Sequence, residues 1–401
     1  MRLKALFIII LWMLPCYLLA QSYTIEGKVT VKGGKTPVSG ASIFLSNSSF
    51  GTTSASDGSF NMNRVRPGQY TLVVTAIGFA QFTKVVMMNS DAVTLQIELE
   101  PKAIELRQVN ISGSSRADWV RNYDIFKKDF IGNDANAKEC VVINPKILNF
   151  TWHRKTQVLD ADAAEFLVVE NRALGYRVKF LLNAFKTDKL EQIVAYEGQR
   201  LFEELPGSEA QKKKWQIKRD QAYYGSAMHF YRSLYTNKLD GEGFEMRRLS
   251  RMHDPERPPE AVLQKKIAAA VEHGRRDSAQ YWYDIANRPK YVNQKLSTVP
   301  WYTLEVLRDG PQPGTYAITF PEYLYVIYKK REETESFKDV YRPLDMPNYE
   351  VSVVTLFSRP PFAIFDKNGI VIGESPLYEG TWSKARLSRL LPVDYLPSAP
   401  L

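Results

Sequence analysis

The stretch Tyr23-Thr24-Ile25-Glu26-Gly27-Lys28-Val29-Thr30-Val31 alternates along its length, with Ile25, Gly27, Val29 and Val31 on one face of an extended chain. A period of two is typical of a β-strand, because successive strand residues point to opposite faces of a sheet. The alternation recurs, between turn residues, at positions 41–45, 51–53, 60–62, 70–74, 82–88 and 93–99. Seven such short strands in succession predict a β-sandwich.

The turns between these strands belong to an ordered series of motifs. Asp57-Gly58 supplies the positive φ of a tight turn, and Pro67-Gly68 presets one turn angle and relaxes the next. The full series is Gly27-Lys28-Val29, Pro37-Val38-Ser39-Gly40-Ala41, Gly51-Thr52-Thr53, Asp57-Gly58-Ser59-Phe60, Pro67-Gly68-Gln69-Tyr70 and Gly78-Phe79. It resembles the carboxypeptidase regulatory-like family. The resemblance implies a transthyretin-like sandwich with an accessory role and no catalytic residues, often found in envelope proteins of Gram-negative bacteria.

The first twenty residues have the composition of a secretory signal peptide. Two basic residues precede an apolar run at 5–14, and the segment ends at Ala20, after which we expect cleavage. The expected location is the periplasm, the outer membrane or the cell surface. A membrane anchor is the alternative, but the run is shorter than the ~20 residues that cross a bilayer and Pro15 interrupts it. No transmembrane span is expected in the mature chain.

The two cysteines bear on the processing of this segment. Acylation of Cys16 would make a lipoprotein, but Leu14-Pro15 are poor residues before such a site, so soluble export is favoured over lipidation. Cleavage would leave Cys140 alone, without a partner for an intramolecular disulfide. Because Cys140 opens the apolar run Cys140-Val141-Val142-Ile143, it is predicted to be a buried structural thiol.

The charge balance favours acidic partners. Removal of Arg2 and Lys4 with the signal peptide leaves 51 basic residues against 44 acidic ones, a net charge of about +7. Such a charge suits an envelope protein, an anionic glycan or a lipid surface. Nucleic acid is not an expected partner, because an exported protein rarely meets it and no recognition motif is present.

The chain is too long for one ordinary domain. We expect a signal peptide at 1–20, the sandwich at 21–100, a linker at 101–117 with the polar run Ser112-Gly113-Ser114-Ser115, and a further region at 118–401. Alternating segments at 147–158, 165–171, 176–182, 192–202, 316–330, 349–357 and 362–372 predict a second, antiparallel sheet. Together with packed helices they make the C-terminal region α+β.

Three helices are predicted in that region. The first covers 119–130. The second follows Pro206-Gly207, where Ser208 and Gln211 are spaced as a capping box, and its apolar stripe continues to Tyr235. The third covers 259–273, with a proline at its start and Gly274 after its end. The run from Lys213-Lys214-Trp215 to Gly243-Phe244-Glu245 resembles uncharacterised exported proteins with the same N-terminal module, which implies no known activity.

No motif in the sequence makes a convincing active site. His253-Asp254-Pro255-Glu256 has the H-x-x-E spacing of metallocarboxypeptidases, but a catalytic zinc needs a third protein ligand and only His273 follows. The sequence contains no G-x-S-x-G elbow and no phosphate-binding glycine loop. We therefore expect no catalytic residue, metal or cofactor. Paired carboxylates such as Glu203-Glu204, Glu242 and Glu245 leave a glycosidase open.

A basic cluster is the strongest local charge feature. It comprises Lys212, Lys213, Lys214, Trp215, Lys218 and Arg219. It could be a solvated helix face or a contact surface for an anionic partner, with Trp215 adding stacking area. The leading hypothesis is an exported cell-envelope accessory protein that binds a partner without catalysis. The alternative is an envelope hydrolase that acts on glycan or peptide through an unrecognised carboxylate site.

Overall fold

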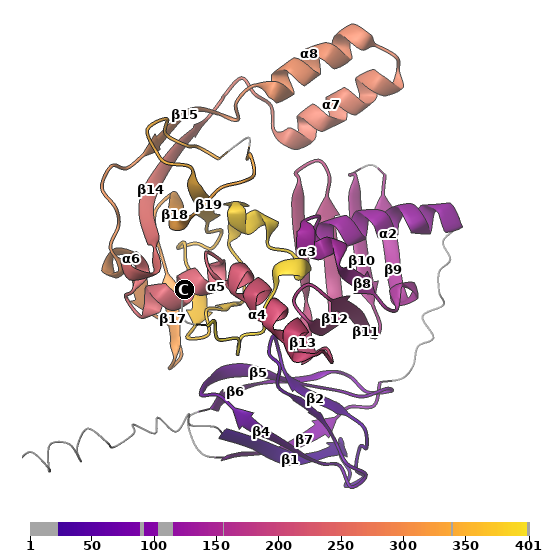
Figure 1. Ribbon diagram of the computed structural model, residues 1–401. Coiled ribbons are helices and arrows are strands. Elements are labelled where there is room, and N and C mark those ends of the chain that lie inside the picture. Colours follow the sequence, from indigo (N-terminus) through magenta and orange to yellow (C-terminus); the bar gives the residue numbers. More distant parts are fainter. Residues whose placement is uncertain (1–22, 89–91, 103–114, 155, 338–339, 399–401) are drawn as a thin grey trace, which may run out of the picture.

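The computed structural model describes residues 23–88, 92–102, 115–154, 156–337 and 340–398. The predicted signal peptide, Cys16 and residues 103–114 of the predicted linker lie outside these ranges. Figure 1 shows a sandwich at one end of the molecule and a larger C-terminal region stacked on it. None of the helices in the described ranges is long and apolar enough to cross a membrane.

The predicted β-sandwich is confirmed. Its strands are β1 (Tyr23–Val31), β2 (Ser42–Leu45), β3 (Gly51–Thr53), β4 (Ser59–Val65), β5 (Gly68–Thr75), β6 (Phe82–Met88) and β7 (Ala92–Leu99). They form two sheets in the orders β4-β1-β7 and β3-β2-β5-β6, with the apolar face of each turned inward. One pair differs from the antiparallel expectation, since β1 and β7 run parallel. Gly27 permits this pairing, because a Cβ there would overlap the carbonyl group of Leu95.

The first unit of the C-terminal region is a six-stranded antiparallel sheet. In spatial order its strands are β8 (Cys140–Val142), β11 (Phe166–Asn171), β12 (Tyr176–Asp188), β10 (Val158–Ala163) and β9 (Leu148–His153), with β13 (Ile193–Glu204) paired to β12. The helix α2 (Arg116–Ile131) crosses one face, and its Phe126 and Phe130 pack on Phe185 and Phe180. The expected single strand at 147–158 is two elements, since β9 ends at His153 and β10 begins at Val158.

The second unit contains two further sheets. One has the order β15 (Tyr291–Leu296), β14 (Phe244–His253), β18 (Tyr323–Glu332), β19 (Tyr349–Thr355) and β22 (Leu377–Gly380). The other has the order β16 (Leu307–Asp309), β17 (Thr315–Ile318), β20 (Ala363–Asp366) and β21 (Val371–Ile372). The short helices of the C-terminal region are α3 (Ala135–Lys138) between α2 and β8, α6 (Leu239–Glu242) before β14, and α9 (Thr303–Val306) between β15 and β16. The α+β expectation is thus confirmed.

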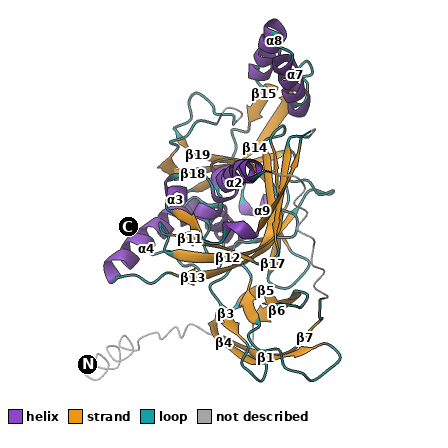
Figure 2. Ribbon diagram, turned by 90° about the vertical axis from the view of Figure 1, so that its right-hand side faces the viewer, coloured by secondary structure: helices purple, strands orange, loops and turns teal. Residues whose placement is uncertain are grey.

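The strands β14 and β15 lead into a helical hairpin made of α7 (Glu260–Glu272) and α8 (Arg276–Asn287). The predicted helix at 259–273 is α7, whereas α8 was not predicted. The hairpin and the sandwich lie at opposite ends of the molecule in both views (Figures 1 and 2).

Two helices, not one, follow the predicted capping box. Ser208 and Gln211 make both reciprocal bonds at the start of α4 (Glu209–Tyr223). The chain then turns at Gly225, where φ is 82°, and continues as α5 (Ala227–Tyr235). The apolar stripe is therefore divided, with Tyr223 in the core of the first unit and Phe230 in that of the second. A side chain at Gly225 would collide with Tyr328, which explains why the turn needs glycine.

Residues 381–398, here called the C-terminal strap, join all three parts of the fold. Trp382 lies in the core of the second unit and Leu387 and Leu391 in that of the first. Val393 lies among the core residues of the sandwich and is 4% exposed. Separately, Phe44 and Val73 of the sandwich bury Leu201 of β13 in a small cluster of their own. The sandwich is thus packed onto the C-terminal region.

Candidate functional site

A cleft of about 940 Å³ opens between the two units of the C-terminal region. Its walls come from β13, the turn between α4 and α5, the chain after β18, and the C-terminal strap. Asn47 of the sandwich and α3 also contribute to the lining. Because these segments lie far apart in the sequence, no local motif could reveal the cleft.

The carboxylates in the lining are engaged by neighbouring side chains. Arg389 Nε lies 2.5 Å from an oxygen of Asp134, and Lys384 Nζ lies 3.2 Å from an oxygen of Glu335. The hydroxyl of Thr381 donates to Glu333 Oε2 at 2.6 Å. These bonds hold the acidic groups at fixed positions in the wall.

Glu350 is the fourth carboxylate of the lining and is more deeply placed. One oxygen lies 3.3 Å from Arg331 Nη1, and Arg331 Nη2 also donates to the carbonyls of Gln221 and Tyr224. The other oxygen, Oε2, is buried beside Gly225 and has no hydrogen-bond partner. Burial raises the pKa of Glu350, since it removes water from the charged form. Burial thus favours the protonated, uncharged form of Glu350.

Cations outnumber carboxylates in the lining. The cations are Arg200, Lys218, Arg331, Lys384, Arg386 and Arg389, against Asp134, Glu333, Glu335 and Glu350. Within the described ranges, no carboxylate forms an ion pair with Arg200, Lys218 or Arg386. The cleft therefore presents unneutralised positive charge to a ligand.

Arg200 is held in place by the sandwich. Its Nε donates to the Asn47 side chain at 2.7 Å, and its guanidinium lies 5.4 Å from the centre of the Phe180 ring. Burial lowers the pKa of Arg200, because neighbouring atoms displace part of its water. The backbone carbonyl of Asn47 accepts a hydrogen bond from the N–H of Val393, and the backbone N–H of Asn47 donates to the carbonyl of Arg200. The sandwich, β13 and the strap thus meet at one asparagine.

Aromatic side chains complete the walls. They are Tyr196, Phe202, Tyr224, Tyr231, Phe337, Phe357, Tyr378 and Trp382. The hydroxyls of Tyr231 and Tyr378 lie 3.1 Å apart and share a hydrogen bond. Rings placed beside arginines are typical of surfaces that bind other molecules.

The structure divides the predicted basic cluster. Lys212, Lys213 and Lys214 are exposed on α4, where Lys212 pairs with Glu209 at 2.9 Å. Lys218 is exposed and lines the cleft. Contact of these lysines with an anionic partner stays a prediction.

Arg219 and Trp215 have structural contacts instead. Arg219 is 7% exposed, lies 2.6 Å from Glu204 and stacks 3.9 Å from the centre of the Tyr176 ring. Its guanidinium is thus enclosed by the fold and does not form part of an exposed contact surface. The Trp215 ring packs over Gly175, and its Nε1 donates to the carbonyl of Arg172 at 2.9 Å. Both side chains attach α4 to the first unit.

The sequence candidates for catalysis do not come together. Glu203 pairs with Lys179, and the next residue, Glu204, pairs with Arg219. Glu245 pairs with Arg247, while Glu242 contacts a histidine. His253 stacks on Tyr291 at the end of β14. In the described part of the chain, no three side chains of His, Cys, Asp or Glu gather where they could hold a metal ion.

Cys140 is buried, and its thiol lies 3.4 Å from the carbonyl of Asn136. Burial raises the pKa of this thiol to about 12. The side chain is therefore held in the unreactive protonated form at neutral pH.

A buried histidine in α5 was not predicted from the sequence. His229 in α5 accepts a hydrogen bond at Nδ1 from the backbone of Gly225, so the proton lies on Nε2, 3.1 Å from Glu242 Oε2. Tyr223 and Phe244 pack against the ring. Burial lowers the pKa of His229 to about 4, which keeps it neutral. A lone histidine between apolar residues has no spacing that would mark it in advance.

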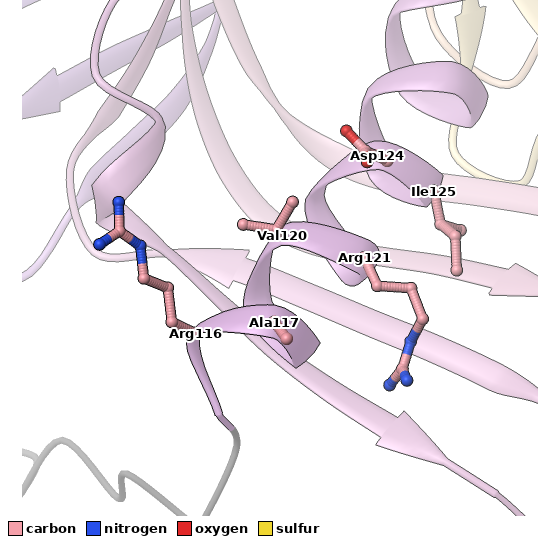
Figure 3. Close-up of a pocket in the computed structure, with 6 residues that line it drawn as sticks. All are labelled: Arg116, Ala117, Val120, Arg121, Asp124 and Ile125. Carbon is pink, nitrogen blue, oxygen red and sulfur yellow. The ribbon is translucent and has the colours of Figure 1, made fainter.

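A second hollow lies on α2 and is lined by Arg116, Ala117, Val120, Arg121, Asp124 and Ile125 (Figure 3). All six residues come from one helix, and the arginine side chains point away from each other. This hollow is open to solvent and lacks facing walls, so the larger cleft is the better candidate site.

Comparison with protein families bears on the sandwich. Residues 25–111 match the model of one family over the strands described above. They form a CarboxypepD_reg-like domain. The family predicted from the turn motifs is thereby confirmed for this domain, and the match reaches beyond the expected boundary at residue 100. Comparison with curated proteins gives no significant match.

Comparison with solved structures gives matches to parts of this chain. A cohesin–X-dockerin complex from Acetivibrio cellulolyticus is 16% identical, with a TM-score of 0.18, over 19% of this chain and 56% of that one. The minor pilin GBS52 from Streptococcus agalactiae is 18% identical, with a TM-score of 0.19, over 21% of this chain and 46% of that one. This chain thus spans about half the length of each.

A further match covers most of both chains. It is a protein from Bacteroides fragilis described as membrane-associated, which is 11% identical, with a TM-score of 0.17, over 89% of this chain and 98% of that one. At such TM-scores, none of these structures informs the function of this chain.

Proposed function

We propose that this chain is an exported accessory protein of the cell envelope that binds an acidic partner in the cleft. The observation that carries the proposal is the unneutralised charge of Arg200, Lys218 and Arg386 beside aromatic walls. The carboxylates of the same walls are engaged in bonds that hold the surface in one arrangement. A preformed site of this kind suits binding, because little ordering is needed when the partner arrives.

The CarboxypepD_reg-like domain supports the proposal in a second way. Its loop positions Arg200 through Asn47, so the accessory domain helps to build the cleft. The predicted signal peptide supports a location in the envelope, where acidic polymers and proteins are available as partners.

Fluorescence anisotropy with labelled poly-L-glutamate and a labelled anionic oligosaccharide would test the proposal. The variant Lys218→Gln/Arg386→Gln removes two cations of the cleft, and Lys213→Gln/Lys214→Gln removes two from the exposed face of α4. The first should weaken binding roughly a hundredfold, since two lost hydrogen bonds to charged groups, at about 1.5 kcal/mol each, sum to about 3 kcal/mol. The second should change it little.

Two results would argue against the cleft as the binding site. Binding that does not weaken as salt is added would exclude a charge-driven contact. Equal losses in the two double variants would place the contact on α4 instead.

Hydrolysis is the second candidate function, and Glu350 is the observation that favours it. A carboxylic acid with a raised pKa in a cleft is a common general acid. However, the unpartnered oxygen of Glu350 is enclosed beside Gly225, and Arg331 holds the other. Turnover of envelope oligosaccharides or peptides by the wild type, lost in Glu350→Gln, would favour the hydrolase.

A further inference from the structure

The cleft contains a free sheet edge. On one side β13 pairs with β12 along its whole length, from Ile193 to Glu204. On the other side, among described residues, only the sandwich loop makes backbone bonds to it, at Arg200 and Phe202. The part of β13 before Gly198 therefore has unpaired N–H and C=O groups on its outer side.

Residues 193–197 keep regular strand geometry up to this free edge. Their register with β12 is unbroken from Ile193 opposite Asp188 to Glu197 opposite Ala184. An extra residue in β12, Asn183, then interrupts the register between Glu197 and Gly198 and separates them from the part that the sandwich covers. Five residues at about 3.3 Å each give an edge of roughly 17 Å.

Little protects this edge from pairing. Proteins usually block free edges with charges, prolines, bulges or covering segments. Here the run Ile193-Val194-Ala195-Tyr196 has no charge and no proline, and the side chain of Ile193 is 42% exposed, while the charged Glu197 stands only at the end of the edge. The same four residues line the cleft. The edge thus lies where the proposed ligand would bind.

We infer that the ligand of the cleft is an extended acidic polypeptide segment that adds to the first sheet as a strand beside β13. Backbone hydrogen bonds to the edge supply the affinity, as in other cases of strand addition. Alternate side chains of the added strand face opposite sides, so acidic ones can meet the cations at Lys218 and Arg386. This inference rests on the proposed function, since it names the chemical class of that ligand.

A polypeptide fits the edge better than a glycan does. The outer groups of β13 alternate donor and acceptor along the strand, a pattern that a second polypeptide backbone matches over several residues. A sugar polymer can satisfy the cations but has no such repeat. The two ligand classes therefore differ in whether backbone amides are needed.

The test begins with a phage-displayed library of random linear decapeptides, selected on the full chain. Enriched sequences should alternate β-branched with acidic residues. A synthetic copy of the best peptide should slow hydrogen exchange at residues 193–197. N-methylation of two alternate backbone amides in one register should weaken it roughly twentyfold, because each lost bond is worth about a factor of five. Methylation in the other register should have little effect, because those amides face away from β13.

The outcomes separate this inference from the proposed function. Acidic peptides that bind equally well after methylation in either register, without protection of 193–197, would overturn strand addition and leave an acidic ligand in place. An anionic oligosaccharide that binds more tightly than any selected peptide would also overturn it. Selected peptides without acidic residues, unaffected by Lys218→Gln/Arg386→Gln, would overturn both.

Discussion

Acidification should destabilise this protein through His229, and the substitution His229→Gln should remove that part of the effect. Burial lowers the pKa of His229 to about 4 in the folded chain, from 6.5 in the unfolded one. Above pH 6.5 the histidine is neutral in both states. Between pH 6.5 and 4 only the unfolded chain takes up the proton, so the free energy of unfolding falls as pH falls. Each pKa unit corresponds to about 1.4 kcal/mol, so a difference of about 2.5 lowers the free energy of unfolding at pH 4 by about 3 kcal/mol.

Urea unfolding between pH 4 and 7, followed by tryptophan fluorescence, would measure this loss. Trp382 reports on the same region, since its ring packs on Phe230 and its Nε1 bonds to Gly225. Glutamine can accept from Gly225 and donate to Glu242, so the variant should fold. His153→Gln, which replaces a half-exposed histidine on β9, is the matched control for the substitution itself. If the wild type and His229→Gln lose stability equally between pH 6.5 and 4, the reasoning is wrong.

Three further predictions concern the fold around the site. Asn47→Ala removes the hydrogen bond to Arg200 and strains a backbone with φ of 61°. It should lower the free energy of unfolding by about 2 kcal/mol and speed hydrogen exchange in the sandwich loop. Unchanged exchange in that loop would argue against a contact between the sandwich and β13 through Asn47. Gly175→Ala places a Cβ inside the Trp215 ring at a residue with φ of 69°. It should lower the free energy of unfolding by about 2–4 kcal/mol, as measured by thermal melting. An unchanged melting temperature would show that α4 can shift. The thiol of Cys140 has a pKa of about 12, so little of it is thiolate at pH 8. It should react with iodoacetamide roughly a thousandfold more slowly than the thiol of the unfolded chain. Similar rates for the two would disprove its burial.

Local patterns predicted the local elements of this fold. The alternation around Ile25 and the Asp57-Gly58 turn led to the sandwich, because strand faces and turn angles depend on neighbouring residues. The capping box at Ser208 was also predicted, since its two bonds span only three residues. These features need no knowledge of the rest of the chain.

Features that depend on distant contacts were not predicted. The stripe of α4 and α5 looked continuous, because Gly225 costs a helix only about 1 kcal/mol and its collision with Tyr328 appears only after folding. In the sequence Arg219 is like its exposed neighbours, and only the folded structure shows that Glu204 and Tyr176 enclose it. The apolar face of the helix α8 packs against α7.

The cleft is the extreme case. Its positive charge depends on which arginines pair with carboxylates. Arg389 pairs with Asp134, whereas Arg386 has no carboxylate partner among the described residues. Sequence spacing does not encode that choice, because the partners come from different segments. The free edge of β13 is hidden in the same way, since a strand pattern does not reveal how many neighbours the strand has.

The C-terminal strap has a consequence for biosynthesis. A ribosome releases the strands of the sandwich first, yet Val393 completes their core and Asp394 bonds to Ser49 across 345 positions. The core of the sandwich is thus completed only after residue 393 has been made. Contacts of such long range slow folding, because the loop between them must be closed before they form. A nascent chain stalled before residue 393 should therefore expose an incomplete sandwich to chaperones and proteases.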